Sequence, residues 1–156
     1  MKKILIALTL VIASIGAAAD TWSPQATIGL VNVGTRSIEV SGGLTFACNL
    51  SGSVTIDAAG NASVGSLSLI EGFACPAIFF NSLPYTMVGN TDNTVTLQEV
   101  NMSGVTGHCF GDLTGDFNQA TGELSFNNAV LPNVGTGLDC KISGTISTNP
   151  QVSFVP

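Results

Sequence analysis

One pattern limits the fold of this chain more than any other, and it is the alternation of apolar and polar residues with a period of two. In residues 44–50 (LTFACNL) every second residue is apolar or cysteine, and residues 53–57, 94–100 and 140–147 repeat this spacing. Such alternation is typical of β-strands with one buried face, and a slip near Gly65 indicates a β-bulge. Turn residues recur about every eight to twelve positions. The sequence therefore predicts an all-β fold, an antiparallel β-sandwich of short strands, with a barrel as the alternative.

Residues 111–126 (GDLTGDFNQATGELSF) have acidic residues at the spacings of a calcium-binding EF-hand loop. These residues stand at positions one, five and twelve: Asp112, Asp116 and Glu123. Position six needs glycine for a sharp turn but holds Phe117, and no helical pattern flanks the stretch. The alternation and Gly122 instead predict a hairpin with a tight loop. We therefore predict no metal site, with a weaker surface site at Asp112 or Asp116 as the alternative.

Residues 1–19 predict export. A positively charged start, an apolar run over residues 4–17 and an A-x-A site before Asp20 are typical of a secretory signal peptide. The apolar run is shorter than the ~20 residues that span a bilayer. We therefore expect a single secreted β-domain over residues 20–156, with no transmembrane segment in the mature chain. The form of the signal is typical of bacteria, so the protein is expected outside the cell or on its outer surface.

The charge of the mature chain excludes two classes of partner. Without the predicted signal peptide, two basic residues (Arg36 and Lys141) oppose ten acidic ones, a formal net charge of −8. Nucleic acid is excluded because its binding needs a basic surface, and so is electrostatic binding to anionic lipid headgroups. Charged residues make up only 9% of the sequence. A surface of Ser, Thr, Asn and Gly suits an extracellular matrix, a fibre or an apolar interface.

The cysteines predict a disulfide framework. An even number of cysteines in an exported chain indicates two disulfides, and the four are Cys48, Cys75, Cys109 and Cys140. The chain has no C-x-x-C pair and a single histidine, so a zinc site is not expected. Of the three possible pairings we favour Cys48–Cys75 and Cys109–Cys140, which are neighbours along the chain. Each would close a loop of roughly 30 residues and stabilise the fold by about 3 kcal/mol.

No pattern in the sequence predicts an enzyme. The single histidine, His108, directly precedes a cysteine that we expect to be bridged, and no G-x-S-x-G motif is present. The acidic residues are scattered through predicted turns, which is weak support for glycoside hydrolysis. No glycine-rich phosphate loop opens a helix. We therefore predict no catalytic residues and no cofactor.

The most unusual segment is residues 72–89 (GFACPAIFFNSLPYTMVG), in which large apolar residues surround two prolines. The prolines exclude a central strand across the whole segment, and the adjacent Phe79 and Phe80 cannot share one face of a strand. We predict a surface connection that touches hydrophobic material, or alternatively a buried crossing between sheets. The predicted contact residues are Phe79, Phe80, Leu83, Tyr85 and Met87. Trp22, the only tryptophan, is either part of this surface or a plug in the fold.

Several motifs resemble a known family over roughly residues 72–150. They are SLPYTM (residues 82–87), Cys109, FNQATGELSFNNAVLP (residues 117–132) and CKISGTIS (residues 140–147). Together they resemble the small secreted proteins called protein activator of alkane oxidation, PraB type. The resemblance implies an exported protein that helps bacteria grow on alkanes and acts outside the cell.

The sequence and the resemblance together predict a secreted, non-enzymatic protein that supports alkane use. It would contact or disperse hydrophobic substrate such as alkane, outside the cell or in the extracellular matrix. The alternative is a structural or adhesive subunit of a pilus or biofilm fibre. Such a subunit needs a spare strand to donate, and residues 26–33 (ATIGLVNV) are the candidate.

Overall fold

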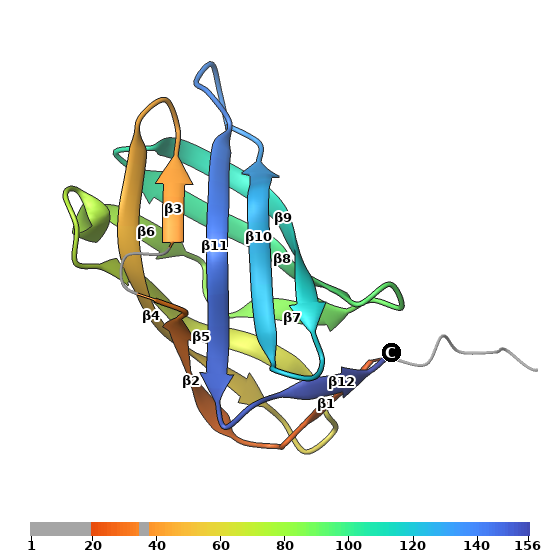
Figure 1. Ribbon diagram of the computed structural model, residues 1–156. Coiled ribbons are helices and arrows are strands. Elements are labelled where there is room, and N and C mark those ends of the chain that lie inside the picture. Colours follow the sequence, from red (N-terminus) through yellow and green to blue (C-terminus); the bar gives the residue numbers. More distant parts are fainter. Residues whose placement is uncertain (1–19, 35–37) are drawn as a thin grey trace, which may run out of the picture.

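The computed structural model describes residues 20–34 and 38–156, so the predicted signal peptide at residues 1–19 lies outside the described part. Strands make up nearly all of the regular structure (Figure 1). The elements in chain order are β1 (Thr21–Ser23), β2 (Thr27–Asn32), β3 (Ile38–Ser41), β4 (Thr45–Ile56), β5 (Ala62–Ile70), the 3₁₀ helix η1 (Cys75–Ala77), β6 (Ile78–Asn81), β7 (Tyr85–Gly89), β8 (Thr94–Gly104), β9 (Gly107–Asn118), β10 (Glu123–Leu131), β11 (Cys140–Asn149) and β12 (Ser153–Val155). Over the described ranges, no helix is long and apolar enough to cross a membrane.

The main sheet closes on itself. Its strands follow the order β10-β9-β8-β7-β5-β4-β2-β11, and β11 pairs with β10 again, which makes a barrel of eight strands (Figure 1). The all-β prediction is therefore confirmed, whereas the prediction of a sandwich is wrong. Alternation buries one face of each strand in either architecture. What decides between them is the β10–β11 pairing, in which Leu124 lies opposite Ile146.

Two positions in the barrel wall are each shared by two short strands. β2 and β3 both lie between β4 and β11, with β2 nearer one end and β3 nearer the other. β7 and β6 both pair with β8, but only β7 also pairs with β5. The wall therefore lacks a β-ladder between β6 and the second half of β5.

The alternating apolar residues point into the barrel and form its core. Val54, Ile56, Val95 and Leu97, for example, are at most 4% exposed. The exception is Leu44, which is 70% exposed because it lies in the β3–β4 turn, before β4 begins.

Two local predictions about the strands are confirmed. The register of β4 against β5 shifts where Gly65 has no partner, which is the predicted bulge. Residues 111–126 fall on β9, a tight turn and β10, with Asn118 paired to Glu123 and Gly122 at a φ of 69°.

Both disulfides have the favoured pairing, Cys48–Cys75 and Cys109–Cys140. The first joins β4 to η1, and the second joins β9 to the start of β11. They close loops with sequence separations of 27 and 31 residues, which corresponds to about 3 kcal/mol each in the chain-entropy model. Both bonds lie toward the end of the barrel that carries the β3–β4 and β8–β9 turns.

The two ends of the domain meet in a small flap. β1 pairs with β12 as a separate two-stranded sheet at the opposite end of the barrel (Figure 1). Trp22 is 1% exposed, and its ring centroid lies 4.7 Å from that of Phe154 and 5.7 Å from that of Phe117. Its indole N–H donates to Asp20 Oδ2, which also accepts a hydrogen bond from the backbone of Gly89. Trp22 is therefore a plug and not part of an exposed surface.

The absence of a side chain at Gly89 allows the β1–β12 flap to pack against the barrel. A Cβ at this position would lie 2.3 Å from the ring of Phe154. We expect Gly89→Ala to lower the free energy of unfolding by about 1–3 kcal/mol, because Phe154 and Trp22 must move. Urea unfolding followed by Trp22 fluorescence measures this.

The matched control is Gly29→Ala, since nothing lies within 4 Å of a Cβ there. This change should stay within about 0.5 kcal/mol of the wild type. Equal losses in the two variants would contradict the role assigned to Gly89.

Candidate functional site

The five residues predicted to contact hydrophobic material do not form one surface. Phe79 is 56% exposed, whereas Phe80 and Leu83 are half-buried against the core. Tyr85 and Met87 are 1% and 6% exposed, so their prediction as surface contacts is wrong. β6 ends at Asn81, and the alternation restarts in β7 with Tyr85 and Met87 on the inner face.

Tyr85 has a structural role at the break between β6 and β7. Its hydroxyl lies 2.5 Å from the carbonyl oxygen of Asn81 and 3.0 Å from that of Asn101, and it accepts a hydrogen bond from the Asn101 N–H. Burial raises the pKa of the Tyr85 phenol, so the hydroxyl stays protonated and able to donate. The side chain therefore ties the end of β6 to β8.

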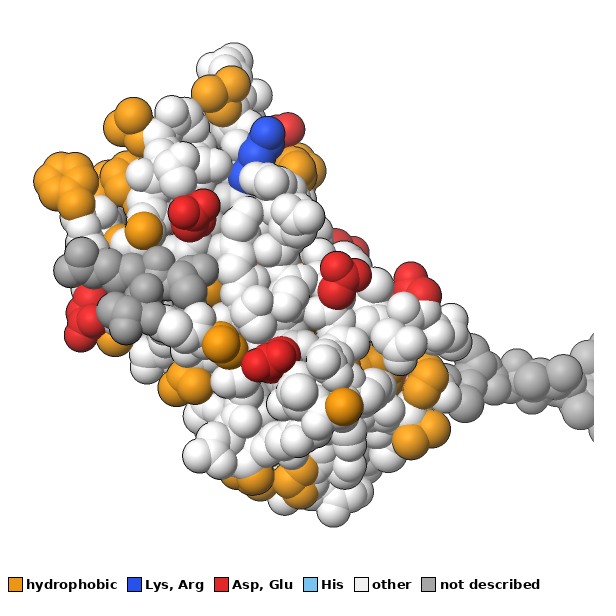
Figure 2. Space-filling model, in the orientation of Figure 1, with side chains coloured by type: hydrophobic (Ala, Val, Ile, Leu, Met, Phe, Trp, Pro, Cys, Tyr) orange, Lys and Arg blue, Asp and Glu red, His pale blue; other side chains and the backbone are white. Residues whose placement is uncertain are grey.

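A different set of apolar side chains is exposed, at the end of the barrel that holds the disulfides. We call this the apolar end, and it comprises residues 42–44, 72–77, 104–107 and 132–138. None of these segments contains a charged residue. The large hydrophobic residues exposed on them are Leu44 (70%), Phe73 (89%), Val105 (50%), Val134 (54%) and Leu138 (66%). Figure 2 shows several separate hydrophobic side chains at this end, with basic and acidic side chains beside them, and further hydrophobic side chains at the opposite end.

The segments of the apolar end touch one another. A Cβ on Gly42 would lie 2.2 Å from the carbonyl oxygen of Thr106, and one on Gly43 would lie 3.5 Å from Leu138. On the other side, a Cβ on Gly104 would lie 2.0 Å from the carbonyl oxygen of Ala77. The glycines thus allow the turns to pack closely, and the exposed residues belong to one continuous end.

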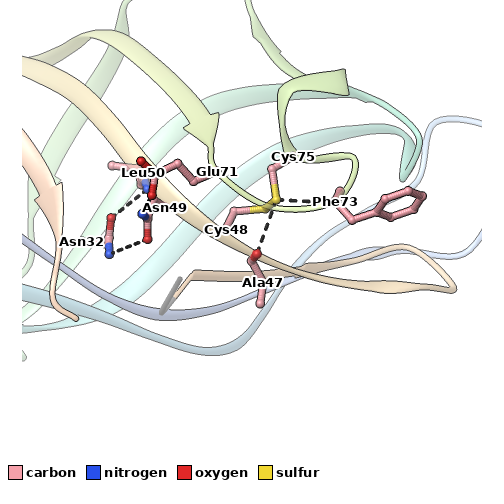
Figure 3. The surroundings of a disulfide bond; sticks show 8 residues. All are labelled: Asn32, Ala47, Cys48, Asn49, Leu50, Glu71, Phe73 and Cys75. Atoms are coloured by element: carbon pink, nitrogen blue, oxygen red, sulfur yellow. Dashed lines mark hydrogen bonds between the residues drawn. A yellow bond between two sulfur atoms is a disulfide. The ribbon is translucent and has the colours of Figure 1, made fainter. Parts of the chain in front are cut away.

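The disulfides hold the apolar end to the barrel wall. Figure 3 shows the Phe73 ring directed away from the Cys48–Cys75 bond, which anchors this loop to β4. The Cys109–Cys140 bond fixes the return of the 132–138 loop, whose Val134 N–H also donates to the carbonyl of His108. The two disulfides therefore hold the backbone of these loops in place, and their apolar side chains stay exposed.

The opposite end of the barrel is acidic. It carries the turns at residues 57–61, 90–93 and 119–122. The side chain and backbone N–H of Asn61 donate to Asp57 and hold the pKa of its carboxyl below the usual value. The Thr94 hydroxyl and N–H do the same for Asp92. These carboxylates stay ionised in mildly acidic water. The four segments of the apolar end contain no charged residue, but the neighbouring Asp139 carboxylate accepts a hydrogen bond from the Asn133 N–H there.

Most of the apolar end was not predicted from the sequence, although a signal for it is present there. Leu44 was assigned to a strand face because the alternation continues through it. Val105 and Leu138 each directly follow a glycine, a residue typical of turns, where a folding role for a large apolar side chain is not expected.

His108 lies on β9, opposite Ser103 of β8. Its Nε2 lies 3.2 Å from Asn101 Oδ1, on the exposed outer face of the barrel. The neighbouring Ser103 hydroxyl instead accepts a hydrogen bond from the Asn81 amide. Within residues 20–34 and 38–156, no hydrogen bond joins the His108 ring to a serine hydroxyl.

The acidic residues of the β9–β10 hairpin serve local structure. Asp112 accepts a hydrogen bond from the backbone N–H of Glu99 across the sheet, and Glu123 accepts one from the Thr121 hydroxyl. Within residues 20–34 and 38–156 no group of three or more His, Cys, Asp or Glu side chains is placed to hold a metal ion.

We expect millimolar calcium to leave the melting temperature nearly unchanged, because Phe117 occupies the position that needs glycine and points into the core. A site filled at 100 times its dissociation constant would add ~2.7 kcal/mol, a shift of several degrees at this size. Calorimetry with and without calcium measures this. A rise that large, abolished by Asp112→Asn, would show that the hairpin binds calcium.

We also expect Phe79 and Phe80 to differ in their effect on stability. Phe79→Ala should cost under ~0.5 kcal/mol, since the ring is largely in solvent. Phe80→Ala should cost about 1–3 kcal/mol, because its ring packs against the core. Chemical unfolding of the two single variants measures the loss in the free energy of unfolding. Equal losses in the two variants would contradict the different burial of the two rings.

Comparison with known proteins agrees with the resemblance seen in the sequence. No curated protein and no solved structure matches the chain. A protein family described as "Alkane oxidation protein activator PraA/PraB-like" matches residues 1–156, well beyond the motifs in the second half of the sequence. The chain therefore belongs to the alkane oxidation protein activator PraA/PraB-like family.

Proposed function

We propose that this protein is an exported, non-enzymatic activator of alkane use that places its apolar end on hydrophobic substrate outside the cell. The family description supplies the link to alkane oxidation. The observation that carries the contact is the group of exposed apolar residues on four uncharged segments at one end of the barrel.

Simple energetics favour this orientation at an oil–water boundary. Burying a Val, Leu or Phe side chain gains about 1.5–3 kcal/mol, and the residues at the apolar end are half to nine-tenths exposed in water. The segments themselves contain no charged side chain that would have to leave water, a step that opposes adsorption strongly, and the Asp139 carboxylate borders them at Asn133. The acidic turns at the other end would stay hydrated.

The disulfides hold the loops of the apolar end in place, which favours contact with an oil surface without unfolding of the protein. Proteins often adsorb to oil by exposing their core, but here the apolar residues are already outside. The two disulfides tie the loops that carry them to β4 and β9. Disulfides are also compatible with an extracellular or periplasmic location, which fits the predicted export signal.

The pilus or biofilm-fibre alternative has less support. Its predicted donor strand, residues 26–33, falls largely on β2, which pairs with β4 on one side and β11 on the other. Withdrawing β2 would open the barrel. A fibre subunit would need another segment to donate, so we do not propose this role.

A triple variant tests the proposed contact. We expect Leu44→Ser, Phe73→Ser and Leu138→Ser together to reduce adsorption to a hexadecane–water interface at least tenfold. Each side chain is mostly exposed, so the free energy of unfolding should fall by under ~0.5 kcal/mol per site. Pendant-drop tensiometry measures adsorption, and urea unfolding measures stability.

The matched control changes three exposed valines away from the apolar end: Val31→Ser, Val33→Ser and Val155→Ser. These residues are 51%, 41% and 72% exposed. The control should adsorb like the wild type. Equal losses in both triple variants would mean that adsorption reflects general hydrophobicity and not this end.

A further inference from the structure

A cleft lies on the barrel wall, and none of its lining residues belongs to the apolar end. Its volume is about 280 Å³, and the β6–β7 turn, β7, β8 and β9 all contribute to it. The cleft is larger than the ~150 Å³ cavity that holds benzene, so it accommodates a six-membered ring with substituents. The polar lining residues are Ser82, Thr86, Gln98 and Glu99, and the other walls are Pro84, Tyr85 and Phe110.

Hydrogen bonds hold two sides of the cleft in place. Tyr85 is 1% exposed, and its hydroxyl bonds to the backbone of Asn81 and of Asn101, which ties the β6–β7 turn to β8. On the other side, the Glu99 N–H donates to Asp112 Oδ1 at 2.9 Å. The cleft is therefore already formed without a ligand, which lowers the entropic cost of binding.

Two of the polar lining residues have a backbone conformation that favours glycine. The φ angle is 60° at Ser82 and 55° at Glu99. Glu99 lies where the register of β8 against β9 shifts between Leu97 and Val100, and a bulge with a positive φ usually places glycine there. Residues held in such conformations are destabilising, and they cluster at ligand sites. Glycine would suit the backbone at position 99 better, and the glutamate instead adds a carboxylate to the cleft.

The chemistry of the lining suits an uncharged ring that carries hydroxyl groups. Ser82, Thr86 and Gln98 offer both hydrogen-bond donors and acceptors, and Glu99 offers acceptors. The Phe110 ring is 43% exposed and forms a flat apolar wall. The C–H face of a pyranose can pack on such a wall while its hydroxyl groups bond to the polar side chains. No Lys or Arg is among the described residues that line the cleft, so phosphate and carboxylate ligands are not favoured.

We propose that this cleft binds one uncharged hexopyranose unit of a polysaccharide. Phe110 packs on the C–H face of the sugar, and Gln98 and Glu99 bond to its hydroxyl groups. This site is independent of the proposed function, because the cleft lies on the wall of the barrel and the apolar end uses exposed turn residues. Either site can exist without the other.

The test is an NMR titration of the folded, disulfide-bonded protein. The probes are the methyl glycosides of glucose, galactose and mannose, with sorbitol as an open-chain polyol that lacks a rigid C–H face. We expect saturable shifts of the Gln98 side-chain amide, the Glu99 N–H and the Phe110 ring with at least one glycoside. The dissociation constant should be about 1–10 mM, which is usual for a ligand of this size. Sorbitol should bind at least tenfold more weakly.

Three variants locate the site. Phe110→Ala and Glu99→Gly should each weaken glycoside binding at least tenfold. Glu99→Gly should do so without lowering the free energy of unfolding, because glycine adopts a φ of 55° at no steric cost. Phe79→Ala is the matched control, since this ring on the neighbouring β6 is 56% exposed and does not line the cleft. The control should bind like the wild type, and unaltered binding to Phe110→Ala would overturn the site.

The wild-type titration decides the matter even if a variant fails to fold. Absence of saturable shifts with all three glycosides, shifts confined to other parts of the chain, or equal affinity for sorbitol would overturn the proposal. Binding of tetramethylammonium in place of the glycosides would also overturn it and would indicate a site for organic cations. Glycoside binding together with normal oil adsorption of the triple variant would instead leave the cleft standing and remove the proposed function.

Discussion

The pairing of β10 with β11 is the constraint on which the rest of the structure depends, because it turns an open sheet into a ring. In an open sheet both outer strands would present unpaired N–H and C=O groups, which favour aggregation. Closure pairs these edges and gives the alternating residues a common interior. Within the described wall the ladder is missing between β6 and the second half of β5, and between β9 and β10 beyond the pairing of Asp116–Asn118 with Glu123–Ser125.

Closure by antiparallel neighbours also sorts the connections into two groups. Successive hairpin turns fall at alternate ends, so the β3–β4 and β8–β9 turns share one end, while the β4–β5, β7–β8 and β9–β10 turns share the other. The first group is glycine-rich and uncharged, and the second contains Asp57 and Asp92. Because the disulfides brace the first end and the β1–β12 flap covers the second, the chemical difference between the ends is fixed by the fold.

Local features and the pairing of cysteines that are neighbours along the chain were predictable from the sequence, whereas the closure of the sheet was not. The β9–β10 hairpin and the bulge at Gly65 follow from neighbouring residues, and the family motifs lie in short stretches. Ring closure depends on β11 meeting strands far away in the chain, which alternation cannot specify. The same limit explains the error at Tyr85 and Met87. Composition marked their segment as apolar, but which residues face inward depends on where β6 stops and β7 begins.

The exposed residues of the apolar end are not explained by folding. Single exposed apolar side chains are ordinary on protein surfaces, and each contributes little to stability. What differs here is their placement, since Leu44, Phe73 and Leu138 stand on separate connections that the barrel brings to one end. Serine or threonine would serve these turns equally well and would hydrate better. The proposed contact with an apolar phase would account for this placement and for the lack of charged residues in the same segments.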